Sequence, residues 1–111
     1  MSLFSHSPQW LKIAESIAEF NWQENHLAIM EVNGRKITLA HYNDTVFAVA
    51  YKCPHAGAVM ADGYLDAVGN IVCPLHRYKF SLQKGRNVTG EGYYLKRYPV
   101  EAREDGIYIC I

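Results

Sequence analysis

Two short segments of the chain each combine a cysteine with a histidine at a spacing that suits metal binding. One proline separates Cys53 from His55, and a proline and a leucine separate Cys73 from His76. In extended backbone, side chains two residues apart face the same side, so Cys53 and His55 can reach one site. A tight turn is needed to bring Cys73 and His76 together. The proline after each cysteine fixes φ and stiffens both loops.

The interval between the two segments also fits a shared site. Seventeen residues, 56–72, separate His55 from Cys73, enough for one strand out and one strand back. The two loops can then meet at their tips and hold a group between them. Two thiolates and two imidazoles suit either zinc or an iron–sulfur cluster. Zinc knuckles commonly pair like residues, whereas each segment here pairs a cysteine with a histidine. A structural zinc ion, or no metal, is the alternative.

This pattern resembles the Rieske [2Fe–2S] family, in which two cysteines hold one iron and two histidines hold the other. Gly57 and Phe80 also resemble residues of the family's loops, and the resemblance is specific within residues 37–85. It implies one [2Fe–2S] cluster, with the two cysteines on the inner iron and the two histidines on the outer iron near the surface. The implied ligands are Cys53, His55, Cys73 and His76.

Short apolar runs separated by turn residues make up most of the chain. Asn33 and Gly34 form a strong hairpin signal because both tolerate positive φ, and Asn43-Asp44 marks another turn. Residues 10–20 fit either an amphipathic helix or a strand followed by a helical turn at 15–20. Pro99 places the longest predicted strand at a sheet edge. Strands are expected at 27–32, 36–41, 46–50, 71–73, 80–82, 93–102 and 107–111. This pattern predicts an all-β sandwich or small barrel.

The resemblance makes this fold more specific. It implies an all-β, Rieske-type antiparallel β-sandwich with a small inserted cluster-binding subdomain. A chain of 111 residues has room for one domain. We therefore expect a single Rieske domain over residues 1–111, with its cluster-binding part at about 52–82.

The loops depart from those of high-potential Rieske proteins. Those proteins carry an extra cysteine in each loop, and the two form a disulfide; here residues 56–58 and Leu75 stand in those places. The loops are therefore expected to be unstapled, as in soluble Rieske-type ferredoxins. Tyr78 stands near the position of a serine that donates to a cluster sulfide, and Arg77 replaces a common glycine. With fewer hydrogen-bond donors to the cluster sulfides, the resemblance implies a reduction potential toward the low end of the Rieske range of roughly −150 to +300 mV. Residues 90–92 are the expected cover of the cluster.

The activity that the resemblance implies is electron transfer. We expect a soluble one-electron carrier between a flavoprotein reductase and a terminal oxygenase or similar redox enzyme. The alternatives are a Rieske small subunit of a larger enzyme, such as assimilatory nitrite reductase, and a zinc-binding module. No residue set for substrate chemistry is visible, because His6, His26 and His41 are scattered. Cys110 alternates with isoleucines and is expected to be an inert strand residue.

Composition limits the partners. Eleven basic and eleven acidic residues give a net charge of zero, which argues against a nucleic-acid binder. No apolar run approaches the roughly 18–20 residues that span a bilayer, so no membrane segment is expected. Residues 1–10 lack a secretory signal pattern, and three cysteines do not make a disulfide framework, so a cytoplasmic location is expected.

Charge is unevenly distributed along the chain. Between residues 77 and 97, six basic residues accompany a single acidic one, Glu91. These residues are either solvated strand faces and turns or a basic docking surface for an acidic protein partner. The basic residues are Arg77, Lys79, Lys84, Arg86, Lys96 and Arg97.

Overall fold

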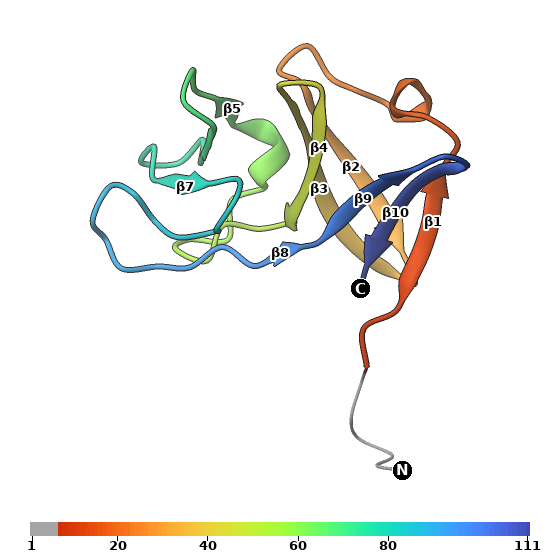
Figure 1. Cartoon of the computed structure of the whole chain (residues 1–111). Coiled ribbons are helices and arrows are strands. Elements are labelled where there is room, and N and C mark those ends of the chain that lie inside the picture. The colour runs from red at the N-terminus through yellow and green to blue at the C-terminus, as the bar shows by residue number, and fades with distance from the viewer. Residues whose placement is uncertain (1–6) are drawn as a thin grey trace.

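A computed structural model describes residues 7–111 as antiparallel strands in three small sheets (Figure 1). Two single-turn 3-10 helices, η1 and η2, span Ile17–Glu19 and Met60–Asp62. The expected all-β class is confirmed. The strands are β1 (Trp10–Ala14), β2 (Leu27–Val32), β3 (Arg35–Tyr42), β4 (Thr45–Ala50), β5 (Tyr64–Leu65), β6 (Asn70–Val72), β7 (Lys79–Ser81), β8 (Arg97–Tyr98), β9 (Val100–Arg103) and β10 (Gly106–Cys110).

The four-stranded sheet, in the order β2-β3-β4-β8, is the middle of three layers. Because successive side chains of a strand point to opposite faces, this sheet contributes to two cores. Ile37 and Leu39 of β3 join Ile109 in the core shared with the β1-β10-β9 sheet. Ala40 joins Phe80 in the core shared with the small β5-β6-β7 sheet. We call the β2-β3-β4-β8 and β1-β10-β9 sheets together the base, and residues 52–96 the small layer.

Two predicted hairpins build the base. Asn33 and Gly34 have φ of 51° and 78°, which a tight two-residue hairpin turn requires. They join β2 to β3 in a continuous register from Leu27↔Ala40 to Val32↔Arg35. Asn43 and Asp44, with φ of 51° and 58°, join β3 to β4 in the same way. Long ladders therefore hold the base sheet without help from the loops.

The structure decides between the two forms predicted for residues 10–20 and corrects the strand predicted at 93–102. Residues 10–20 form a strand and then η1, the second of the two predicted forms. The single strand predicted at 93–102 is wrong, because the chain leaves the middle sheet at β8 and enters the other base sheet at β9. Pro99 lies between these strands and has no N–H for a ladder. Both β8 and β9 are edge strands, so the edge position is confirmed.

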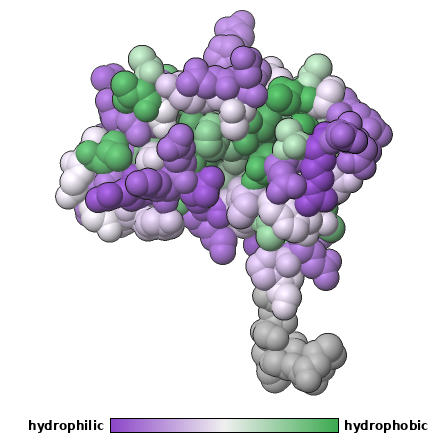
Figure 2. Space-filling model, in the orientation of Figure 1, coloured by the Kyte–Doolittle hydropathy of each residue, from purple (hydrophilic) through white to green (hydrophobic). Residues whose placement is uncertain are grey.

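The small layer is built from strands of only two or three residues. A side chain at Gly63 would place its Cβ 1.9 Å from the Val72 carbonyl oxygen, so this approach requires glycine. Residues 83–96 return beside the small sheet, and Leu95 is buried in its core. Figure 2 shows hydrophobic residues gathered near the middle of the visible face and hydrophilic residues around them.

The expectation about a secretory signal falls mostly on residues 1–6, which lie outside the described part of the chain, as does His6. Within residues 7–111, no helix is long and apolar enough to cross a membrane.

Candidate metal centre

The first loop connects β4 to η2 and carries Cys53 and His55. Its ends are joined by a hydrogen bond from the Cys53 N–H to the Ala58 carbonyl, 2.7 Å long. The Gly57 N–H donates to the Cys53 carbonyl at 2.9 Å, and Gly57 has a φ of 73°, which glycine adopts freely. The loop thereby buries Cys53, which is 2% exposed, and leaves His55 half-buried.

The second loop connects β6 to β7 and carries Cys73 and His76. The Cys73 N–H donates to the Tyr78 carbonyl at 2.8 Å, which closes a tight turn. His76 and Arg77 both have positive φ, 65° and 57°. Left-handed backbone costs a residue with a Cβ about 1–2 kcal/mol. Arg77 thus adopts a conformation that glycine would take without strain. The turn buries Cys73 completely and exposes His76.

Folding brings the four predicted ligands together as two pairs. Cys53 and Cys73 are both buried in the same core and lie close to each other. Burial raises the pKa of Cys73 to about 11; a bond from the Leu75 N–H opposes this rise, and the Cys53 thiol adds to it. Nearer the surface, the ring centres of His55 and His76 are 5.2 Å apart. The structure therefore places a sulfur pair beneath an imidazole pair.

One unsatisfied atom tests whether these residues fit a metal group. Nδ1 of His55 is buried and has no hydrogen-bond partner in the described part of the molecule. Leaving such an atom unpaired costs about 1–3 kcal/mol, but a nitrogen that binds a metal needs no hydrogen bond. Among residues 7–111, no three His, Cys, Asp or Glu side chains are placed to hold one ion. Because the two imidazoles and the two thiols form separate pairs, a group with two metal atoms, one for each pair, fits the residues present.

Two tyrosines complete the surroundings of His55. The Tyr78 ring stacks on the His55 imidazole with centres 4.1 Å apart and planes at 30°. The Tyr93 ring lies 5.4 Å from His55 and 5.9 Å from Tyr78. These contacts orient the imidazole and shield one of its faces from water. No spacing signal in the sequence marks Tyr93 as a neighbour of His55, because it arrives on the returning segment.

The loop at 90–92 lies near the imidazole pair, where a cover was expected. Asn87 organises it, since its side-chain carbonyl accepts from the Gly92 N–H at 3.0 Å and its amide donates to Glu91 at 2.9 Å. The hydrogen bond from Thr89 is the main cause that lowers the pKa of Glu91, and the nearby His55 contributes less. Glu91 is therefore a carboxylate held close to the histidine side of the centre.

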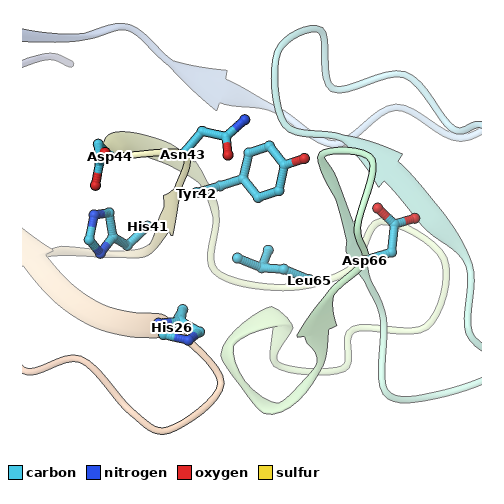
Figure 3. A pocket seen from close by; sticks show the side chains of 7 residues that line it. All are labelled: His26, His41, Tyr42, Asn43, Asp44, Leu65 and Asp66. Atoms are coloured by element: carbon cyan, nitrogen blue, oxygen red, sulfur yellow. The ribbon is translucent and has the colours of Figure 1, made fainter.

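The scattered histidines lie elsewhere. His26 and His41 line a separate surface hollow of about 480 Å³ (Figure 3). Two polar side chains of this hollow have structural partners: the Tyr42 hydroxyl donates to the Ala67 carbonyl at 2.8 Å, and Asp66 accepts from the backbone N–H groups of Val68 and Asn70. The His41 ring stacks on Trp22 with centres 5.4 Å apart, consistent with a structural role.

Comparisons with known proteins agree with this geometry. A family model described as the Rieske [2Fe–2S] domain matches residues 9–99. The 3-phenylpropionate/cinnamic acid dioxygenase ferredoxin subunit of Photorhabdus laumondii is 37% identical over 76 residues, covering 68% of this chain and 72% of the relative.

Two solved structures share the fold. One is the ferredoxin of carbazole 1,9a-dioxygenase from Nocardioides aromaticivorans, with a TM-score of 0.74, 22% identity, and coverage of 94% of this chain and 97% of that one. The other is described as an NADH-dependent nitrite reductase small subunit from Mycobacterium tuberculosis, with a TM-score of 0.78, 20% identity, and coverage of 94% and 96%.

Proposed function

The chain belongs to the Rieske [2Fe–2S] domain family, and we therefore propose that it is a one-electron carrier between a flavoprotein reductase and a terminal oxygenase or similar redox enzyme. The observation that carries this proposal is the buried thiol pair beneath an imidazole pair with an unsatisfied ring nitrogen. That arrangement suits a redox centre that is anchored inside the protein and reached from its surface.

The cofactor is one Rieske-type [2Fe–2S] cluster, which takes up and releases a single electron. Cys53 and Cys73 would hold the inner iron, because their thiols are paired in the interior. His55 and His76 would hold the outer iron, and Nδ1 of His55 is the atom left free for it. No residue is assigned to substrate chemistry.

The protein's own groups determine how a partner reaches the centre. The exposed His76 places the histidine side at the surface, which shortens the distance to a docked partner. Tyr78 and Tyr93 cover a face of His55 and limit the access of water. The loops hold no cysteine besides the two ligands, so no disulfide braces them. With few donors toward the cluster, a low potential within the Rieske range is expected.

The remaining features of the proposal concern organisation and location. We infer one domain over residues 1–111, with the cluster-binding part at about 52–82. The protein would act in the cytoplasm with redox proteins as partners, and without nucleic acid or a membrane.

A small subunit of a larger redox enzyme is the second candidate. The structural match to a protein described as a nitrite reductase small subunit supports it, but both structural matches are below 25% identity and concern the fold alone. The 37% identical relative is a ferredoxin subunit of a dioxygenase, which favours the separate carrier. Co-purification from the native host distinguishes the two, since a carrier elutes alone and a subunit elutes with its enzyme.

A single-turnover experiment tests the carrier function. The purified holoprotein is reduced with dithionite, freed of excess reductant, and mixed with the oxidised terminal oxygenase of a 3-phenylpropionate dioxygenase system. We expect the visible spectrum of the oxidised carrier to return, with one electron delivered for each chain. A protein that cannot be reduced and reoxidised reversibly would contradict the proposal.

A further inference from the structure

A cavity of about 190 Å³ opens beside β8 and the end of β10. Its floor is apolar, with two buried side chains and an exposed proline, and its rim carries three basic side chains. The residues that matter here are Arg35, Lys96, Arg97, Tyr98, Pro99 and Ile111.

No carboxylate side chain of the described residues forms an ion pair with this rim. Within that part of the chain, the ion pairs involve cations other than Arg35, Lys96 and Arg97. Two of the three side chains are nonetheless held in place. The Nε–H of Arg97 donates to the Leu82 carbonyl at 3.1 Å, and Lys96 Nζ lies 5.5 Å from the centre of the Tyr98 ring. An anionic group beside an apolar side chain would match this surface.

The size of the cavity indicates what enters it. Pockets that enclose a small-molecule ligand usually measure about 300–1,000 Å³. A cavity of about 190 Å³ is smaller than that range and is bounded by an open basic rim. A single apolar side chain on a protein surface, with carboxylates around it, is the occupant that fits both properties.

The cavity is connected to the metal centre by one short segment of chain. Tyr93, at one end of this segment, lies 5.4 Å from His55, and Arg97 at the other end lines the cavity. Four residues of extended chain span at most about 14 Å. Leu95 is buried, and the Lys96 carbonyl accepts from the Ala50 N–H at 2.8 Å, so the segment is firmly attached. A protein lying over the cavity can therefore also reach the imidazole pair.

We propose that this cavity and its rim of Arg35, Lys96 and Arg97 form the docking site for an acidic redox partner. The inference rests on the proposed function. It reduces the docking surface suggested by the six basic residues of 77–97 to those that line this cavity. Lys79 of that stretch lies 3.7 Å from Asp66 and is partly neutralised. Arg35, which is distant in sequence, joins the site through β3. The partner inserts an apolar side chain into the cavity, and its carboxylates raise the encounter rate by attraction to the rim.

A rate measurement tests the charge requirement. Flavodoxin, a small acidic flavoprotein, serves as the probe: its hydroquinone gives one electron to the oxidised holoprotein and becomes the semiquinone. We expect the second-order rate constant to fall as salt rises. At low salt, the double variant Arg35→Ala/Lys96→Ala should react about five- to tenfold more slowly.

The control removes one cation from a distant part of the base and is compared with the single variants Arg35→Ala and Lys96→Ala as well as with the double variant. Lys12 lies on β1 and its side chain reaches the Gly106 turn, so Lys12→Ala should change the rate by less than about twofold. Unchanged visible spectra verify that each variant retains the cluster. If the double variant reacts as fast as the wild type, the docking site is wrong. A wild type with no reducible cluster would instead contradict the proposed function.

A second measurement locates the contact without electron transfer. Cys110 also lines the cavity and is half-buried, so iodoacetamide modification at this residue, read by peptide mass spectrometry of the holoprotein, reports access. Oxidised flavodoxin should slow the modification of Cys110 at low salt and lose this effect at high salt. It should protect the double variant much less. Equal rates with and without flavodoxin at low salt would overturn the proposal.

Discussion

The base and the small layer of this protein are stabilised in different ways. The base has strands of four to eight residues, besides the two-residue β8, joined in long ladders with hairpin turns at residues that tolerate positive φ. The strands of the small layer have two or three residues, and its loops contain left-handed His76 and Arg77. From this difference we expect the base to fold on its own contacts and the small layer to depend on the cluster that its two loops are proposed to hold.

The largest effect is expected from the loss of a cysteine ligand. Cys53→Ser replaces a buried thiol of the sulfur pair, and the variant should lose the visible absorption and the low-temperature EPR signal of the reduced cluster almost completely. Cys110→Ser is the matched control, because Cys110 lies on β10 in the base. It should keep both signals. Normal absorption in Cys53→Ser would refute the ligand assignment.

Removal of iron should increase the local opening of the small layer much more than that of the base. Without a metal group, the loops that carry Cys53 and Cys73 lose their common attachment, so amide protons of residues 52–82 should exchange at least tenfold faster. Amide protons of β3 and β10 should change far less, because ladders protect them. Hydrogen exchange read by mass spectrometry measures both. Equal acceleration in the two regions would mean that the base also depends on the cluster.

A core substitution in the base should act independently of the cluster. Ile109 is fully buried between the base sheets, and Ile109→Ala should lower the free energy of unfolding by about 2–5 kcal/mol. The loss should be similar in the holoprotein and the iron-free protein, as measured by urea unfolding. Ile109→Val, as the conservative variant, should cost only about 0.5–1.5 kcal/mol. A loss seen in the holoprotein alone would link the base core to the metal centre.

Two glycines provide the finest comparison. At Gly63, an added Cβ would meet the Val72 carbonyl at 1.9 Å, so Gly63→Ala must displace the residue before Cys73. It should cost about 1–3 kcal/mol and lower cluster occupancy. At Gly34, φ is 78° with nothing within 4 Å, so Gly34→Ala should cost about 1 kcal/mol and leave occupancy unchanged. Iron content and urea unfolding of the two variants decide whether cluster occupancy falls because of the clash beside Cys73 or falls with any loss of stability.

Local signals in the sequence were sufficient to predict most of the base. Asn33-Gly34 and Asn43-Asp44 each carry their turn chemistry within two residues, and both hairpins form as predicted. The strand predicted at 93–102 was wrong because its division depends on tertiary pairing. Arg97 and Tyr98 pair with β4, whereas the residues after Pro99 pair with β10. No local pattern shows where a chain changes sheets.

The candidate site also has a part that the sequence predicts and a part that it does not. The spacing of cysteine and histidine was enough to predict which four side chains would meet, and the structure brings them together in two pairs. The approach of Tyr93 to His55 and the meeting of Arg35 and Lys96 at one cavity could not be predicted, because each joins segments far apart in the sequence. Such contacts follow from the packing of the layers and leave no periodic signal.

The ligand assignment itself is tested most directly by anomalous diffraction at the iron edge from crystals of the holoprotein. We expect two iron peaks, one bonded to the sulfur atoms of Cys53 and Cys73 and the other to ring nitrogens of His55 and His76. A single metal peak bound by all four side chains, or a peak at the zinc edge, would contradict the account.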